Sequence, residues 1–383
     1  MRRPSALAHR STERAASITI VALAALAIAS VATAGPAGAS ASLMPVFDPA
    51  SPQTRAIEGL FVKVLVISAV IFTVMAALIA IAIVRFRARG GALPEQDEGS
   101  HRAEIAWMVG PIVIVLLLAA ISAKLVLAIN VRPKADPPDE RPAGAHADLE
   151  VTGRQWWWEV RYTASGAIAA NEIHIPTGKQ LRVLVQSADV AHCFWVPRLA
   201  RKIDAIPGRS NFIWLEADAP GEYQGYCAEF CGTQHAWMRF KVFAHPQAEF
   251  DAWIDAQLAH RAQLATGSAG ALASEGERLF RSLSCVDCHR VGGVDRAVAV
   301  GPDLTHLSGR TTLGGGVIAN SPQNLASWLR NPQAIKPGSK MPNFNLTEDQ
   351  VAALVAFLGE GGAAPPQRRA AAEGRDDATE VRR

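Results

Sequence analysis

Two long stretches that are almost free of charge restrict the fold of this chain more than any other feature. Residues 57–84 carry only Glu58 and Lys63, near the start of the stretch, and residues 105–129 are charged only near their end. Each stretch exceeds the roughly 20 residues that a helix needs to cross the hydrocarbon core of a bilayer. Leu, Ile and Val dominate both stretches. We therefore expect a membrane hairpin of two transmembrane helices within residues 55–130.

Basic residues set the expected orientation of this hairpin. Arg85, Arg87, Arg89 and Arg102 lie in the loop between the two stretches, and membrane proteins keep short loops rich in Lys and Arg in the cytoplasm. Both ends of the hairpin then face outward. Everything after residue 130 is expected outside the cell membrane, on its periplasmic or extracellular side.

The first 41 residues have the pattern of a secretory signal. Four arginines precede an uncharged run at residues 18–30, and small residues including Ala37-Gly38-Ala39 follow it. A basic region, a short apolar region and a small-residue cleavage site are typical of a signal peptide. We predict a removable signal peptide within residues 1–41. The alternative, a retained first membrane helix, is disfavoured by the short apolar core.

The remaining residues have the composition of soluble domains, and five cysteines are their most informative feature. Cys227 and Cys231 form one close pair, Cys285 and Cys288 form a second, and Cys193 stands alone. Disulfide scaffolds are usually smaller and richer in Cys, so the pairs indicate metal or haem chemistry. The net charge is only +3, without a basic block beyond the first residues, so nothing indicates a nucleic-acid partner.

Short β-type runs separated by turn residues occupy residues 147–247, after a Pro-rich linker at residues 131–146. The runs are LEVTG, WWWEVRY, EIHIP, LRVLVQS, FWVP, FIWLEA and MRFKVF. Several short strands at this spacing predict an all-β sandwich or barrel.

The sequence pattern of the C-terminal third predicts a helical domain. Residues 248–273 are expected to form a helix followed by a flexible linker. Residues 274–360 carry two helical patterns, SEGERLFRSL and TEDQVAALVAFL, around loops rich in Gly and Pro. Residues 361–383 mix Ala, Pro and both charge signs, which predicts a disordered tail.

A haem attachment motif lies in the helical domain. Cys285-Val-Asp-Cys288-His289 has the C-x-x-C-H pattern, in which both thiols bond to the porphyrin and the His binds the iron. A zinc or redox C-x-x-C is the alternative. Met341, in GSKMPNF, is the candidate second axial ligand, and His306 is its rival. His/Met ligation leaves no iron position open for substrate and suits electron transfer.

A second group of candidate metal ligands lies near the end of the β-type region, before the helical domain. Cys227, Cys231, His235 and Met238 place two thiolates, an imidazole and a thioether within twelve residues. Soft sulfur with imidazole and a weak Met is a copper ligand set, and two thiolates in one loop can bridge two coppers. Structural zinc is the alternative, but it gives Met238 no role. His192, in SADVAHCFWVP, is the best candidate for a second imidazole.

These motifs resemble a known family. SADVAHCFWVP, KIDAIPGR, YCAEFCGTQHAWM and GRQWWWEV look like the copper-A domain of cytochrome c oxidase subunit II, in the order and spacing of that family. The resemblance covers residues 55–245 and implies a cupredoxin-like fold for residues 147–247. The appended haem domain resembles a class I cytochrome c and matches the caa-type branch of the family.

The resemblance implies a role for each candidate ligand. Cys227 and Cys231 bridge the two coppers, His192 and His235 each cap one copper, and Met238 is a weak ligand.

The resemblance also implies roles for residues around the copper pair. Glu229 donates its backbone carbonyl to one copper, and its carboxylate faces a magnesium site shared with subunit I. Asp204 supports the water network of that site. Cys193 stands where the family usually has Ser. This thiol is open to oxidation or, as a buried residue, behaves as a small apolar side chain.

Trp156 and Glu104 match residues that the family uses to transfer electrons and protons, respectively. Trp156 matches the exposed tryptophan through which electrons enter the copper centre. If residues 156–158 form a strand, Trp156 and Trp158 share one face and Trp157 takes the other; core packing is the alternative and explains two of the three. Glu104, in an E-x-x-W sequence, matches a site where protons enter subunit I, although interfacial carboxylates are often merely solvated. His174, His245 and His260 are expected to be structural or solvated.

The resemblance implies an electron relay. Electrons pass from cytochrome c or another respiratory donor through haem c and copper-A to the haem–copper site of subunit I, which reduces oxygen to water and pumps protons. Subunit III is a further implied partner, and this chain has no oxygen-reducing site of its own. Two alternatives stay open: a copper-A subunit of a nitric oxide reductase, and a membrane-tethered electron carrier without a catalytic partner.

Overall fold

The computed structural model describes most of the chain in two separate units. It describes residues 47–87, 99–130, 147–266, 270–292 and 300–359. The predictions of a signal peptide in residues 1–41, of a linker at residues 131–146 and of a tail at residues 361–383 fall outside the described residues. The hairpin helices belong to one unit, and the β and helical domains belong to the other, so each unit is considered by itself.

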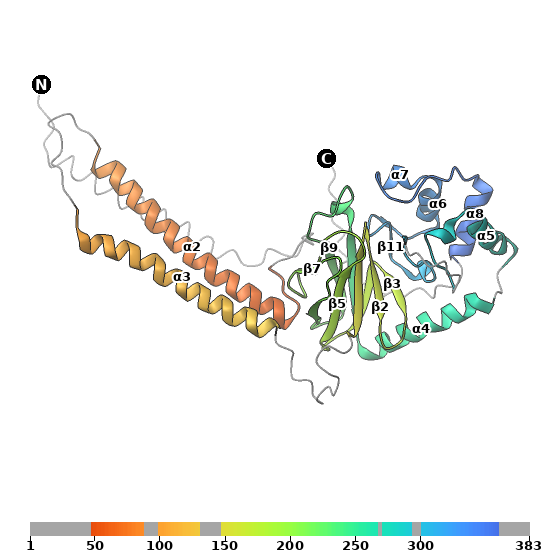
Figure 1. Cartoon of the computed structure of the whole chain (residues 1–383), viewed down its shortest axis with the longest axis horizontal. Coiled ribbons are helices and arrows are strands. Elements are labelled where there is room, and N and C mark those ends of the chain that lie inside the picture. Colours follow the sequence, from red (N-terminus) through yellow and green to blue (C-terminus); the bar gives the residue numbers. More distant parts are fainter. Residues whose placement is uncertain (1–46, 88–98, 131–146, 267–269, 293–299, 360–383) are drawn as a thin grey trace, which may run out of the picture. The chain divides into compact units, whose positions relative to one another are not determined.

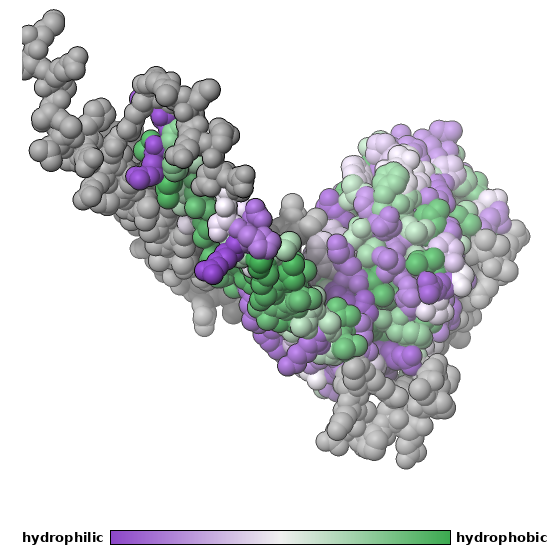
Figure 2. Space-filling model, turned by 60° about the vertical axis from the view of Figure 1, so that its left-hand side comes forward, coloured by the Kyte–Doolittle hydropathy of each residue, from purple (hydrophilic) through white to green (hydrophobic). Residues whose placement is uncertain are grey.

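Two long apolar helices make up the first unit. Helix α2 spans Pro52–Arg85 and helix α3 spans His101–Asn130, and the two run in opposite directions (Figure 1). Each has a mean hydropathy of 2.9 over its most apolar window. No side chain of α3 is buried within the described chain, and Figure 2 shows apolar side chains on the visible surface of the hairpin. This outward-facing apolar surface suits a bilayer or a membrane partner. A helix satisfies its backbone polar groups within itself, as the interior of a bilayer requires.

Two five-stranded sheets form the sandwich domain, residues 147–247. Their orders are β3-β2-β1-β5-β8 and β4-β10-β9-β6-β7. The strands are β1 Leu149–Arg154, β2 Trp157–Tyr162, β3 Ile168–Ala170, β4 Glu172–Pro176, β5 Leu181–Ser187, β6 His192–Trp195, β7 Ile203–Ala205, β8 Asn211–Leu215, β9 Gly221–Cys227 and β10 Arg239–His245. The β1–β5 and β4–β10 pairs are parallel, and the other pairs are antiparallel.

The core lies between the two sheets. Burial alternates along β1 and along the first part of β5, because successive side chains of a strand point to opposite faces. Trp158, Phe194 and Phe240 meet at the centre, with ring centroids 4.7 to 5.7 Å apart. Edge-to-face and offset aromatic contacts of this kind stabilise a core beyond the area that they bury.

Three of these strands have no counterpart among the β-type runs expected from the sequence. They are β3, β7 and β9. Strand β9 contains two glycines, which disfavour a strand by local propensity. Its pairing with β10 and β6 overrides that propensity, and a Cβ at Gly225 would overlap the Phe240 ring. Tertiary packing, rather than local propensity, therefore explains why the residues that end at Cys227 form a strand.

Helices dominate the helical domain, which is defined here as the described residues from 270 to 359. Its helices are α5 Ala271–Ser282, α6 Pro322–Arg330, α7 Pro332–Ile335 and α8 Glu348–Gly359, and β11 Thr312–Leu313 pairs with β12 Ile318–Ala319. Helices α5 and α8 approach so closely that a Cβ at Gly276 would overlap the backbone of Ala353. Helix α5 begins inside the stretch expected to be linker, because its first turn buries Ala273.

Helix α4, Gln247–Thr266, follows the last strand of the sandwich domain and packs on it. Trp253 stacks on His174 at a centroid distance of 4.0 Å and lies 5.2 Å from the Tyr162 ring. His174 Nδ1 lies 2.8 Å from His245 Nε2. Burial lowers the pKa of His174, so this imidazole is neutral near pH 7 and packs as a structural residue.

Leu215→Ala should destabilise the sandwich domain. Leu215 is fully buried on β8, and truncating a buried Leu costs about 2–5 kcal/mol because it removes apolar contacts and leaves a cavity. Urea unfolding followed by tryptophan fluorescence measures the loss. Phe212→Ala on the same strand is the control, since Phe212 is 37% exposed. An equal or greater loss for the control would contradict the sandwich core.

Candidate metal and haem sites

Strand β9 delivers the first sulfur ligand, and the loop after it delivers the second. Cys227 ends β9, and Cys231 follows after a short loop. Their Sγ atoms lie 3.8 Å apart, and both side chains are buried. A hydrogen bond from Cys231 lowers the pKa of Cys227, and a hydrogen bond with His192 lowers it further, against the effect of burial. One thiolate is therefore already favoured before a cation arrives.

Nitrogen and thioether donors surround the two sulfurs. His192 Nδ1 lies 3.9 Å from Cys227 Sγ, and His235 Nδ1 lies 3.7 Å from Cys231 Sγ. Met238 Sδ is also 3.7 Å from Cys231 Sγ. The structure thus brings together all the side chains that the sequence singled out for copper.

The donor set fits a binuclear copper centre better than a zinc ion. Met238 is 1% exposed and its sulfur faces the cysteine pair, whereas a tetrahedral zinc site of two Cys and two His needs no thioether. The backbone oxygen of Glu229 lies 3.3 Å from Cys227 Sγ and adds a further donor. Two shared thiolates, two imidazoles and two weak donors could hold a pair of copper ions.

A carboxylate that the sequence interpretation missed holds His192 in place. Asp189 Oδ1 lies 2.8 Å from His192 Nε2, while the backbone N–H of Gln155 donates to Asp189 Oδ2 at 2.6 Å. Burial alone would raise the pKa of Asp189, but the hydrogen bonds from Gln155 and His192 lower it. Outer carboxylates of this kind fix the tautomer and orientation of a ligating His. The D-x-x-H spacing of residues 189 and 192 is the signal that could have revealed it.

The three consecutive tryptophans take different positions. Trp157 and Trp158 are buried, so core packing accounts for two of the three. Trp156 lies in the turn before β2, so the strand alternation expected for it does not apply. It is half-buried rather than openly exposed, because Lys340 of the helical domain lies over its ring at 5.6 Å. Its Nε1–H donates to the carbonyl of Cys231 at 3.0 Å.

The structure also describes the other residues for which the resemblance implied a role. Cys193 is buried next to Asp204 on the paired strand β7, and burial raises the pKa of its thiol to about 12. It therefore stays protonated, as a small apolar side chain would. The side chains of Glu229 and Asp204 are exposed, as is Glu104 in the first turn of α3.

The C-x-x-C-H motif borders an apolar cavity in the helical domain. Cys285 begins a short 3-10 helix and Cys288 follows its last residue. His289 Nδ1 lies 2.8 Å from the carbonyl oxygen of Pro302. Burial lowers the pKa of His289, which favours the neutral imidazole that a metal requires. A Cβ at Gly301 would overlap this imidazole, so only glycine permits the close approach.

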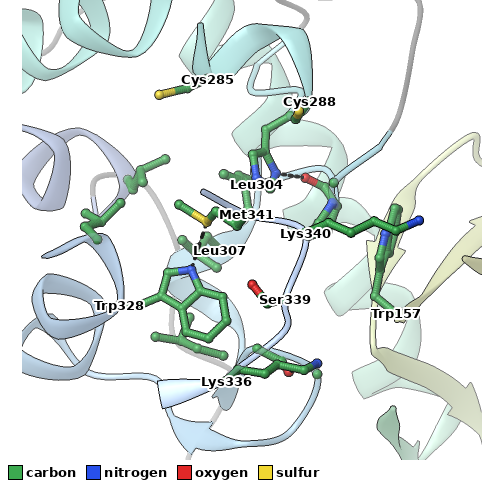
Figure 3. A pocket seen from close by; sticks show the side chains of 18 of the residues that line it. Trp157, Cys285, Cys288, Leu304, Leu307, Trp328, Lys336, Ser339, Lys340 and Met341 are labelled. Carbon is green, nitrogen blue, oxygen red and sulfur yellow. Dashed lines mark hydrogen bonds between the residues drawn. The ribbon is translucent and has the colours of Figure 1, made fainter. Parts of the chain in front are cut away.

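Met341 lies in the same cavity. Figure 3 shows its sulfur beside Trp328, whose Nε1–H donates to Met341 Sδ at 3.2 Å. Leucines supply much of the lining: Leu304, Leu307, Leu313, Leu325, Leu329, Leu346, Leu354 and Leu358. Among the described lining residues Met341 is present and the rival His306 is not. An apolar cavity bordered by two Cys, a His and a Met fits a covalently bound haem.

Comparisons with known proteins decide the family. Residues 39–125 match the family "Cytochrome C oxidase subunit II, transmembrane domain", and residues 167–244 match its periplasmic domain. Residues 273–361 match the family "Cytochrome c". Cytochrome c oxidase subunit 2 of Alkalihalophilus pseudofirmus is 34% identical over 320 residues, covering 82% of this chain and 90% of that protein. The chain belongs to the cytochrome c oxidase subunit II family.

A second relative and a solved structure are also similar to this chain. Cytochrome c oxidase subunit 2 of Bacillus sp. is 34% identical and covers 71% of this chain and 79% of that protein. A crystal structure of the periplasmic domain of subunit II of cytochrome oxidase from Bradyrhizobium japonicum is 33% identical. It covers 30% of this chain and 96% of that chain, with a TM-score of 0.29.

Membership confirms the fold class expected from the sequence. A two-helix membrane hairpin precedes a cupredoxin-like copper-A domain, and a cytochrome c domain is fused after it. As a subunit II with a cytochrome c domain, the chain takes part in electron transfer within a haem–copper oxidase complex. The family implies copper-A, haem, a subunit I partner and a cytochrome c donor.

Cys227→Ser and Cys231→Ser should each abolish the near-infrared mixed-valence absorption of the purified protein. Serine oxygen cannot replace the soft sulfur that shares an electron between two coppers. Cys193→Ser is the matched control and should keep the band, because Cys193 is a buried thiol outside the cluster. Survival of the band in both cluster variants would remove the copper-A interpretation.

Asp189→Asn should weaken copper binding by about 10- to 100-fold, the usual effect of losing an outer partner of a ligating His. The change keeps the shape but removes the charge that holds His192 Nε2. Copper retention against a chelator measures the effect. The control is Asp251→Asn on α4, where the carboxylate accepts a hydrogen bond from Gln247. Equal retention in the two variants would argue against this role.

Proposed function

We propose that this chain relays electrons from a respiratory donor, through haem c and then copper-A, to the haem–copper site of subunit I. The observation that supports this most directly is the 3.8 Å separation of Cys227 Sγ and Cys231 Sγ, with imidazole and thioether donors around them. When bound, the haem iron and the copper pair would each accept and return one electron.

The residues of the helical domain would hold the haem and exclude substrates from its iron. Cys285 and Cys288 would hold the haem covalently, and His289 and Met341 would bind its iron. An iron bound by both a His and a Met would transfer electrons rather than bind oxygen. The carbonyl of Pro302 would hold the His289 imidazole in one orientation through its Nδ1–H.

The residues of the sandwich domain would keep the copper pair in one geometry. Cys227, Cys231, His192 and His235 would hold the copper pair, and Met238 would bind weakly. The Glu229 carbonyl would add a second weak ligand. Because these donors are supplied by β6, by β9 and by the loop between β9 and β10 of a packed sandwich, they would move little when an electron arrives.

Trp156 is the residue we propose for passing electrons to the copper centre. Its indole donates to the Cys231 carbonyl, and it also lines the cavity that holds Cys288 and His289. Cover by the helical domain therefore suits an internal transfer from the fused haem domain. A tether of this kind raises the effective concentration of the donor beside its acceptor.

The remaining roles depend on partner subunits. Subunit I would reduce oxygen to water and pump protons, and subunit III would complete the complex. The exposed carboxylate of Glu229, with Asp204, would face a magnesium site at the subunit I interface, and Glu104 would stand where protons enter. The copper and haem domains would lie on the outer side of the cell membrane.

The Cys231→Ser variant of the purified complex tests the relay. A reduced donor should still reduce the haem of the helical domain, but oxygen consumption should fall to background because the copper step is lost. Cys193→Ser should keep oxygen consumption. Haem absorbance after rapid mixing and an oxygen electrode supply the two measurements.

The alternatives have distinct outcomes in the same preparation. Nitric oxide consumption in place of oxygen consumption would favour a copper-A nitric oxide reductase. Failure to recover a large haem-bearing membrane subunit after gentle detergent purification would favour a lone carrier. Undiminished oxygen consumption by Cys231→Ser would overturn the relay.

A further inference from the structure

Polar contacts join the sandwich domain and the helical domain, and one of them buries a carboxylate. Glu172, at the start of β4, is 3% exposed. Its Oε1 accepts hydrogen bonds from the backbone N–H groups of Thr311 and Thr312, at 2.8 and 3.1 Å. The hydroxyls of the same two threonines also donate to it, at 2.7 and 3.4 Å. Every one of these donors belongs to the helical domain.

This arrangement makes Glu172 dependent on the other domain. A buried carboxylate is costly unless hydrogen-bond donors or positive charge compensate it. Burial raises the pKa of Glu172, and the hydrogen bonds from Thr311 and Thr312 and the charge of Arg310 act against that rise. The compensation comes entirely from residues 310–312, so the contact favours one orientation of the helical domain over others.

Arg310 connects this contact to the haem cavity. Its side chain lines the cavity beside His289 and Thr312, and its guanidinium donates to the backbone carbonyl of Asp303. The charge of Glu172 acts on Arg310. The carboxylate of the sandwich domain therefore partly offsets the only arginine charge among the described residues that line the cavity.

The sign of the electrostatic effect follows from the charges. Reduction adds an electron to the haem, and a nearby negative charge opposes that addition. Glu172 acts directly through its charge and indirectly by offsetting Arg310. Both effects favour loss of the electron by the haem.

We propose that Glu172 is a positioning residue of the sandwich domain that lowers the reduction potential of the haem held by the helical domain. The docked haem domain is then a better donor to copper than an undocked one. Only this last consequence rests on the proposed direction of electron flow. The change in haem potential itself is measured at equilibrium and does not depend on that direction.

Lys336 provides a charge of opposite sign at the same interface. It belongs to the helical domain, is 4% exposed and lines the haem cavity. Its ammonium donates to the carbonyls of Gly314 at 2.7 Å and Trp237 at 3.5 Å, the latter in the sandwich domain. Both Glu172 and Lys336 thus hold the domains together, but their charges should act on the haem in opposite directions.

The test is an anaerobic redox titration of the haem in the purified complex carrying Glu172→Gln. Gln keeps the size and one acceptor oxygen but removes the charge. For an assumed separation of about 10 Å, a unit charge changes a one-electron equilibrium by about two- to sixteenfold between aqueous and protein-surface dielectric constants. The haem potential should therefore rise, by at most about 70 mV for the sixteenfold case.

Two further variants separate charge from loss of docking. Glu222→Gln is the matched control, because Glu222 pairs with Lys241 on β10 and should leave the haem potential unchanged. Lys336→Met should lower the haem potential. If the variants merely released the helical domain, Glu172→Gln and Lys336→Met would shift the potential in the same direction.

The outcomes are decisive. A rise with Glu172→Gln and a fall with Lys336→Met supports the proposal. An unchanged or lower potential in Glu172→Gln, or shifts of the same sign in both variants, overturns it. Failure of the proposed relay would appear separately, as a haem that copper does not oxidise while the titration shifts persist.

Discussion

The close approach of two cysteine sulfurs is the constraint on which the rest of this structure depends. Cys227 and Cys231 hold their Sγ atoms 3.8 Å apart in a buried site, where two negative charges would repel each other without cations between them. The sandwich supplies the frame that makes this arrangement stable. The aromatic core of Trp158, Phe194 and Phe240 lies beneath it and leaves the ligands few alternative positions.

The fused helical domain covers part of the surface next to the candidate copper ligands. Lys340 covers part of Trp156, and Lys336 contacts the loop that carries the ligands. In the proposed relay, the tethered haem domain thus occupies the surface at which electrons would reach Trp156. The buried Glu172 gives this contact a polar, orientation-dependent component, which a purely apolar interface would lack.

Sequence reasoning singled out the candidate sites through local spacing. Two thiols four residues apart with a nearby His and Met predict a copper site, and the C-x-x-C-H motif predicts a haem site, without a fold. It missed Asp189, although it lies three residues from His192, because a carboxylate in a loop has no signature until its partner is placed. It also missed β9, because two glycines hide the strand from propensity.

The sequence by itself determined the membrane hairpin, the order of the domains and the identity of the candidate ligands, since hydrophobic length and ligand spacing are local properties of the chain. Only the tertiary structure brought His192 to Cys227 across 35 positions, covered Trp156 and buried Glu172 against Thr311. These contacts depend on strand pairing and domain docking. Both arise from packing between distant segments, which no local pattern records.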